Sequence, residues 1–337
     1  MARRRDPVET AATDEVDLQE VSTWEPRTPI DRLAVAIYGI IAVGIHGVVL
    51  LVAVTVTAAL LATPAIVLAD DPVLSVFLVL SIVPAALLAA YIWYADITTQ
   101  EPLALLVGTF LLAMLFATFA AVVNSAAALV LQTATLFGAV VFFYLVVAPA
   151  EETVKLLAVR VFAYRSRSFD AVIDGAVYGA VAGLGFAAIE NALYITRHVA
   201  QVGPEAGVIT AATGITTIRM IVGPGHVIFS AIAGYYLGLA KFTPEHAGPL
   251  VVKGLFLASL AHGTYNVTVQ FAPDFLALAT PLGPNTSLIA YVIAFDLLVA
   301  YYLYRRIVRY RRTYRAVHGQ PPDDPTPEPT EFDGPLE

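Results

Sequence analysis

The sequence contains no cysteine and little charge, and each deficit removes a class of protein. Without cysteine the chain has no disulfides, no thiolate metal ligands and no cysteine nucleophile. Only 14% of its 337 residues are Asp, Glu, Lys or Arg, whereas 58% are hydrophobic. A soluble globular domain carries about 25% charged residues. The composition therefore excludes an ordinary soluble protein and predicts a membrane protein with several spanning helices.

Glycine-rich patterns that bind phosphate are also missing. Neither Gly-x-Gly-x-x-Gly nor the P-loop sequence occurs, so nothing supports nucleotide chemistry. The formal net charge of −8 says little about a partner, because it comes largely from the two polar ends of the chain. We therefore expect the lipid bilayer and membrane proteins as partners, and no nucleic acid.

Long apolar runs make up most of what is present, and eight of them can cross a hydrocarbon core of roughly 30 Å as helices. They cover residues 33–62, 73–94, 102–131, 134–164, 171–196, 211–240, 249–271 and 286–304. Thr63-Pro64 is a point at which the first run can end or kink. The sequence predicts an all-α fold, a polytopic transmembrane helix bundle of about eight spans.

The basic residues indicate the orientation of these spans. With eight spans, one face receives most of them: Arg3, Arg4, Arg5, Arg27, Arg32, Arg160, Arg165, Arg167, Lys241, Lys253, Arg305, Arg306, Arg309, Arg311, Arg312 and Arg315. Only Arg197 and Arg219 lie towards the other face. The positive-inside rule makes the crowded face cytoplasmic. We expect a multi-pass protein of the cell membrane with both termini in the cytoplasm.

The two ends of the chain differ in composition from the part between them. Residues 1–31 are acidic and the segment 316–337 is acidic and rich in proline. Such segments bury too little apolar surface to offset the entropy of ordering, so we expect both to be disordered. The acidic start is unlike a cleaved signal peptide. A transmembrane helical domain is expected over residues 32–315.

Polar groups interrupt the apolar runs in the second half of the chain. The clusters are Glu151-Glu152-x-x-Lys155, Phe186-x-x-x-Glu190-Asn191, His226 and His262-x-x-x-Asn266, on the fourth to seventh runs. An ionised side chain at the bilayer centre costs roughly 2.5–3.5 kcal/mol on insertion scales, so such groups are usually functional. Structural explanations exist for single clusters: Glu151 can neutralise Lys155, and the last cluster can make one interhelical hydrogen bond.

The depths of these groups favour one shared site. A rise of about 1.5 Å per residue places Glu151 about 21 Å from Arg165, His226 about 22 Å from Lys241 and His262 about 20 Å from Pro249. Because neighbouring helices alternate in direction, these three groups are expected in one layer. The same rise places Glu190 about 28 Å from Ala171 at the start of its helix, which is farther along than the other three groups.

A layer of carboxylates, imidazoles and an amide can activate water in two ways. Glu190, His226 and His262 can hold a divalent ion such as zinc and leave one position for water. Alternatively, Glu151 or Glu152 can take a proton from water while histidine and Asn266 donors stabilise the oxyanion. Two neighbouring carboxylates do not easily stay ionised together, so one can be the donor while the other is the base.

Several small features predict architecture. Gly175, Gly179 and Gly183 share a helix face, and Gly234 with Gly238 repeats the spacing on the next helix, which favours close helix packing. Asp174 is expected to pair with Arg165, Arg167 or a backbone group. Pro149 frees a backbone carbonyl and can kink the fourth span beside the glutamates.

The ordered series of clusters resembles the PrsW family of intramembrane proteases. The motifs are Glu-Glu-x-x-Lys, Gly-Phe-Ala-x-x-Glu-Asn-x-x-Tyr, a single histidine and His-x-x-x-Asn, on successive spans. The family is similar to the wider CAAX prenyl-endopeptidase group, in which a histidine stands where this chain has Glu190. Asp96 with Glu101-Pro102 resembles the family's acidic signature before the third span. The resemblance covers roughly residues 91–270.

This resemblance implies a function and a set of residues. The functional set would be Glu151, Glu152, Glu190, His226, His262 and Asn266. The reaction would be hydrolysis of a peptide bond in or near the membrane segment of a membrane-anchored protein, such as a regulatory anti-sigma factor. The motifs leave the choice between a metalloprotease and a glutamic-type protease open.

Two other functions use similar residues. Buried carboxylates, histidines and a lysine also form proton relays, so a proton-coupled transporter or channel is one alternative. A non-catalytic membrane scaffold is the other. The polar groups gather on spans four to seven, the two halves of the chain show no internal repeat, and the series is intact. These features favour the protease.

Overall fold

The structure is a computed structural model that describes residues 25–98, 100–131, 135–202 and 207–318. Most of the two predicted tails, 1–31 and 316–337, falls outside these ranges, so their predicted disorder stays a prediction. The chain divides into two compact units, residues 1–59 and 60–337. The described residues form helices and connecting turns and contain no β-strand, as the all-α prediction required.

Each predicted span coincides with a helix. The helices are α2 (Pro29–Asp70), α3 (Pro72–Tyr94), α4 (Leu103–Ala128), α5 (Leu136–Phe142), the π-helix η1 (Phe143–Val147), α6 (Ala148–Val161), η2 (Ala163–Arg165), α7 (Val172–Val202), α8 (Val208–Phe242), η4 (Pro244–His246), α9 (Ala247–Thr268), α10 (Ala272–Ala279) and α11 (Pro284–His318). Side chains cap the starts of α3 and α5, where Asp71 accepts the Val73 N–H and Thr135 accepts the Gly138 N–H. The short helix α10 was not predicted.

The lengths of these helices agree with a membrane bundle. In the described residues, six helical segments are long and apolar enough to cross a membrane: α3, α4, the continuous segment Leu136–Arg165, α7, α8 and α11. Helices α2 and α9 match the first and seventh predicted runs but are not among the six, so two of the eight predicted spans stay predictions. Helix α2 continues through Pro64, so Thr63-Pro64 does not end it. The protein is therefore a multi-pass membrane protein.

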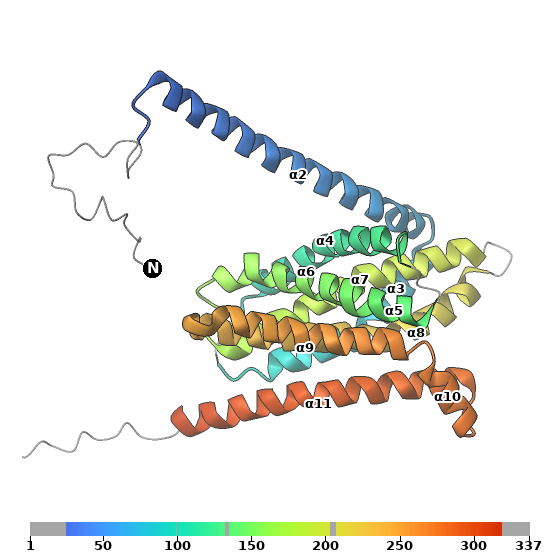
Figure 1. The fold of residues 1–337 in the computed structure, drawn as a ribbon. Coiled ribbons are helices and arrows are strands. Elements are labelled where there is room, and N and C mark those ends of the chain that lie inside the picture. The colour runs from blue at the N-terminus through green and yellow to red at the C-terminus, as the bar shows by residue number, and fades with distance from the viewer. Residues whose placement is uncertain (1–24, 99, 132–134, 203–206, 319–337) are drawn as a thin grey trace, which may run out of the picture. The chain divides into compact units, whose positions relative to one another are not determined.

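Helix α7 occupies the centre of the second unit, residues 60–337. It packs most extensively against α8 and also contacts α3, α4 and α6, while α9 packs on α8 and α6 (Figure 1). Glycines allow the closest approach, as predicted. A Cβ added at Gly179 would overlap the carbonyl of Ser230, and one at Gly183 would overlap the carbonyl of His226. The glycine face of α7 thus presses directly on the backbone of α8.

The bundle has two distinct ends. At one end α3, α6 and α8 finish and α4, α7 and α9 begin, and we call it the basic end because it holds Arg160, Arg165, Arg167 and Lys241. Lys241 fixes the connection between α6 and α7 there, because its ammonium donates to the carbonyls of Tyr164, at 2.8 Å, and Phe169, at 2.7 Å. The opposite end, where α9 leads through α10 into α11, is called the far end.

Candidate active site

Glu151 lies in the first turn of α6, and Glu152 follows it. Helix α6 begins directly after the π-helix η1. A proline cannot donate a backbone hydrogen bond, and Pro149 therefore leaves a carbonyl free one turn earlier. The chain accommodates it with a π-helical turn, a feature that often marks functional sites. The disturbance predicted at Pro149 is thus a change of helix type just before the glutamates.

Glu152 lies fully buried at the centre of a polar network. Its carboxylate accepts hydrogen bonds from Lys155, at 2.7 Å, from His262 Nδ1, at 2.8 Å, and from Ser230, at 3.2 Å. Lys155 is equally buried. Its ammonium forms its ion pair with Glu152, at 2.7 Å, and not with Glu151. Three donors on one carboxylate keep it ionised and hold the His262 ring in a fixed orientation.

His262 turns its second nitrogen towards Glu151. Its Nδ1 is engaged with Glu152, and its Nε2 lies 3.7 Å from Glu151 Oε2. The other oxygen, Glu151 Oε1, accepts a hydrogen bond from the side chain of Asn124 at 3.0 Å. Glu151 Oε2 itself is buried and has no hydrogen-bond partner. One carboxylate oxygen is therefore held, and the other is free to act.

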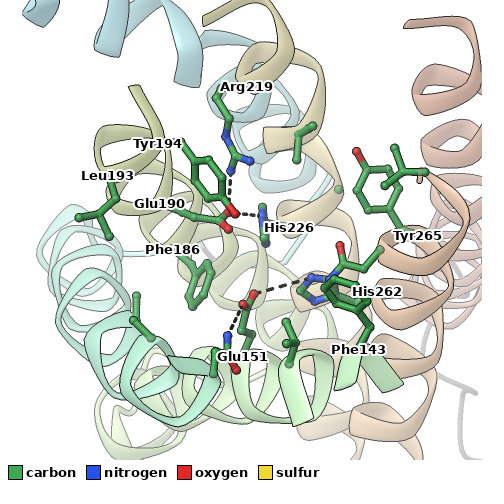
Figure 2. A pocket seen from close by; sticks show the side chains of 18 of the residues that line it. Phe143, Glu151, Phe186, Glu190, Leu193, Tyr194, Arg219, His226, His262 and Tyr265 are labelled. Atoms are coloured by element: carbon green, nitrogen blue, oxygen red, sulfur yellow. Dashed lines mark hydrogen bonds and ion pairs between the residues drawn. The ribbon is translucent and has the colours of Figure 1, made fainter. Parts of the chain in front are cut away.

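His226 connects this group to Glu190. Its Nδ1 lies 3.0 Å from the Lys155 ammonium, and its Nε2 lies 2.8 Å from Glu190 Oε2. An ammonium has no lone pair, so Nδ1 accepts and Nε2 carries the hydrogen that Glu190 receives. Glu190 also pairs with Arg219 at 2.6 Å (Figure 2). Phe186 covers this junction, with the Lys155 ammonium 4.2 Å from its ring centroid.

A cavity of about 590 Å³ opens beside these groups. Figure 2 shows Glu151, His262, His226 and Glu190 converging on it from three sides. The cavity also reaches Ala128 near the end of α4, Arg197 on α7 and Gln270 just after α9, so it extends towards the far end of the bundle. A chain entering from that end can reach the carboxylates and imidazoles.

The donor set fits a metal ion in part. Glu151, His226 and His262 each offer a ligand atom, and these atoms lie within 4.8 Å of one another. Two imidazoles and a carboxylate are a usual zinc ligand set, and Glu151 Oε2 is a buried oxygen without a partner. His226 is the exception, because both of its nitrogens already have protein partners. It would bind an ion only by giving up one of them.

The structure can be compared with the predicted residues one by one. Glu151, Glu190, His226 and His262 line the cavity, and so does Asn266, one turn beyond His262. Glu152 is buried behind His262. The three-ligand group contains Glu151 in place of the predicted Glu190, whose carboxylate is instead paired with Arg219. Glu190 nevertheless contacts the group directly, because its carboxylate lies 2.8 Å from His226 Nε2.

Two polar residues of the site were missed from the sequence. Asn124 belongs to none of the polar clusters noted in the sequence, yet it donates to Glu151. Arg219 was counted only as a residue of the sparsely basic face, yet it is 7% exposed and binds both Glu190 and Asn191. A signal existed for Arg219: it precedes His226 by two helical turns and therefore shares its face of α8. Asn124 gave no comparable signal, because its contact joins α4 to α6.

Comparison with known proteins adds an independent result. The chain matches the PrsW family of intramembrane metalloproteases over residues 101–301. Protease PrsW of Oceanobacillus iheyensis is 29% identical over 200 residues, which are 59% of this chain and 86% of that protein. The protease PrsW of Geobacillus kaustophilus is 30% identical over 188 residues, 55% of this chain and 76% of that protein. That of Bacillus subtilis is 30% identical over 132 residues, 39% and 55% of the two chains.

No solved structure gives a significant match. The matched region runs from the start of α4 into α11 and so includes every carboxylate and imidazole of the cavity. Sequence match and geometry therefore point to the same part of the molecule, and the chain belongs to the PrsW family of intramembrane proteases.

Proposed function

We propose that the chain hydrolyses a peptide bond in or near the membrane segment of a membrane-anchored protein, with water activated in the cavity beside Glu151. The observation that carries the proposal is the convergence of Glu151, His226 and His262 within 4.8 Å at this cavity. Family membership favours this function over the transporter, channel and scaffold alternatives. The groups are those that peptide hydrolysis needs: a base, an orienting network and oxyanion donors.

Glu151 is the proposed base. Its free oxygen Oε2 would take a proton from water while the water oxygen attacks the peptide carbonyl carbon, and the protonated carboxyl would then return the proton to the departing amine. Asn124 holds the other oxygen at 3.0 Å and so orients the carboxylate. The carbonyl oxygen gains negative charge during the attack, and Asn266, which lines the same cavity, can donate to it.

Glu152 and Lys155 are proposed as positioning residues. Glu152 fixes the tautomer of His262, and Lys155 holds both Glu152 and His226. Such supporting contacts commonly change activity 10–100-fold when removed from a metal site. Where an ion is bound, Glu151, His262 and His226 would hold it, with His226 exchanging a partner. The ion would supply Lewis-acid polarisation and a more acidic water.

The position of the cavity indicates where in the substrate segment the cleaved bond would lie. Because the cavity extends towards the far end, we propose that the cleaved bond lies in the half of the substrate segment nearer that end. Under the predicted orientation this half faces away from the cytoplasm. A membrane-anchored regulatory protein, such as an anti-sigma factor, would be a suitable substrate.

The decisive experiment measures cleavage of a membrane-tethered reporter by purified protein in liposomes. Glu151→Gln keeps the shape of the side chain but cannot accept the proton, so cleavage should fall by about 10²–10⁴-fold. Glu245→Gln is a matched control, because Glu245 is exposed on η4 at the basic end. Wild-type cleavage by folded Glu151→Gln would overturn the proposal.

Metal analysis of the same preparations separates the two mechanisms. A metalloprotease should contain about one bound ion per chain, and His262→Ala should lose the ion and the activity together, since a site of three ligands tolerates no loss. Reversible inhibition by a chelator should accompany this loss. Full activity in protein freed of metal would instead assign the chemistry to Glu151 alone.

A further inference from the structure

A second group of carboxylates lies at the basic end, away from the cavity. Asp96 and Glu101 lie in the connection between α3 and α4, and Asp174 lies in the first turn of α7. One oxygen from each residue lies within 4.8 Å of one from each of the others. Asp174 and Glu190 are sixteen residues apart on α7, which corresponds to about 24 Å along the helix.

Each carboxylate has one oxygen held by the protein. Asp96 Oδ1 accepts from the backbone and side chain of Thr98, at 2.8 and 2.7 Å. Asp174 Oδ2 accepts from the backbone N–H groups of Asp170 and Ala171, at 2.7 and 2.8 Å. Glu101 Oε2 accepts from the hydroxyl of Tyr178. These contacts fix the orientation of all three groups and confirm the predicted backbone partner of Asp174.

The second oxygen of each carboxylate receives no hydrogen bond from a protein donor, and the carboxyl groups of Asp96 and Asp174 are close enough to interact with each other. Asp96 Oδ2, Glu101 Oε1 and Asp174 Oδ1 are all buried and lack a hydrogen bond. The Glu101 residue is 4% exposed and the Asp174 residue 0%. Buried polar atoms are nearly always satisfied, so three unpaired oxygens in one cluster call for a ligand that supplies positive charge. Asp96 is only partly buried as a residue, so the cluster lies near the protein surface on this side.

Lys241, a cation near this cluster, does not fill this role. Lys241 is close enough to influence Asp174 and Glu101 electrostatically. Its ammonium has three hydrogens, and it lies 2.7 to 3.4 Å from the carbonyls of Phe169, Tyr164 and Ser166. It therefore stabilises the connection before α7 without bonding to the three free oxygens.

We propose that Asp96, Glu101 and Asp174 form a binding site for a hard divalent cation, Ca²⁺ or Mg²⁺. Carboxylate oxygens are the ligands that both ions prefer, and waters entering beside Asp96 can complete the coordination.

The bound ion would join segments that are distant in sequence. It connects the α3–α4 loop to the start of α7, the helix that carries Glu190 and whose glycines position His226. The role is structural or regulatory and is independent of whether the cavity itself uses a metal.

Terbium luminescence tests the site directly, because Tb³⁺ substitutes for Ca²⁺ and is excited through a nearby tyrosine. Tyr178 is bonded to Glu101 and supplies that tyrosine. Full-length protein in detergent should show tyrosine-sensitised emission that CaCl₂ displaces. Asp96→Asn should weaken Tb³⁺ binding at least tenfold, whereas Glu245→Gln should not, because this residue lies at the same end but outside the cluster.

Thermal unfolding gives a second readout. In protein first treated with EDTA, 10 mM CaCl₂ or MgCl₂ should raise the unfolding midpoint by several degrees, since a ligand that binds only the folded state stabilises it. Glu101→Gln should lose this shift and serves as the second variant if Asp96→Asn fails to fold. No emission and no shift in the wild type would overturn the proposal. Equal responses in the variants and the wild type would overturn it too, and would assign the wild-type binding to other acidic residues.

Discussion

Lys155 has an unusual position for a charged residue, since it is 1% exposed inside a membrane protein. It contacts Glu152 and His226 and lies over the ring of Phe186. A buried ion pair adds little net stability, but removal of one partner leaves the other charge unpaired. Lys155 is therefore more important for what it holds in place than for its own interaction energy.

Lys155→Met tests this role. Met has a similar length but no charge, so Glu152 would be left buried and unpaired, at a cost of about 3–5 kcal/mol. We expect a lower thermal midpoint and loss of reporter cleavage. The double variant Lys155→Met/Glu152→Gln should recover part of the stability but not the activity, because His262 would still lack its carboxylate.

Lys253→Met is the control for this experiment, since Lys253 is exposed on α9. It should change the free energy of unfolding by no more than about 0.5 kcal/mol, as surface substitutions usually do. A Lys155→Met protein as stable as the wild type would show that Glu152 does not depend on this partner.

At the scale of elements, the pairing of α7 with α8 determines the site. Glu190 on α7 reaches His226 on α8 because the glycine face of α7 lets the two backbones approach. A larger residue at Gly183 would displace the backbone at His226 itself. Helix packing and the orientation of the His226 imidazole are thus coupled at one position.

Gly183→Ala should expose this coupling. The added Cβ would overlap the His226 carbonyl, so the helices must separate locally, at a cost of about 1–3 kcal/mol. We expect reporter cleavage to fall by more than the loss of folded protein explains. Gly248→Ala is the control, because nothing lies within 4 Å of a Cβ at that position. Equal activity of the two variants would separate packing from catalysis.

The sequence predicts helices better than it predicts contacts between them. Apolar runs give eight helices, since a backbone in lipid must satisfy its own hydrogen bonds. The same argument misses α10, which is too short for a membrane run. It also misses η1, because a π-helical turn has no composition of its own.

The site shows the same limit. Helix rise places Glu151, His226 and His262 at one depth, which the structure agrees with. Depth does not fix rotation about the helix axis, however. The partners of Lys155, Glu190 and Asn124 depend on that rotation and on neighbours far away in sequence. Sequence spacing therefore only allowed Glu151 as a partner of Lys155, whereas the structure pairs Lys155 with Glu152, and the spacing gave no sign of the Asn124 contact.

For the whole molecule, orientation in the membrane is the first prediction. Ser168 follows α6 at the basic end, and Asn285 begins α11 at the far end. The chain has no cysteine of its own, so single cysteines at these positions can be labelled selectively. In intact cells an impermeant reagent should label Asn285→Cys and spare Ser168→Cys. Labelling of both from outside would contradict the eight-span topology.

Dependence of stability on pH is the second prediction for the whole molecule. Burial raises the pKa of Glu101 from 4.5 to about 8, so between these values the folded state binds more protons than the unfolded state. Stability should therefore fall as the pH rises through this window. The groups that influence Glu101 are Tyr178, Asp174, Asp96 and Asp170, with Lys241 nearby.

Thermal midpoints of the wild type and Glu101→Gln, measured in EDTA from about pH 5 to about pH 9, isolate this contribution. The wild type should lose stability with rising pH more steeply than the variant. Parallel curves would mean that Glu101 does not titrate in this window.

The charges around the cavity do not cancel. With the histidines neutral, Glu151, Glu152 and Glu190 carry three negative charges, and Lys155 and Arg219 supply two positive ones. Because the low-dielectric interior screens charges only weakly, the remaining negative charge favours binding of either a proton or a metal ion. A proton makes the site neutral, whereas a divalent ion reverses its sign. Asn266 can donate to a carbonyl oxygen in either state, but only the second state would add a net positive charge that attracts this oxygen as its own charge grows, so the counterion would influence the speed of the reaction.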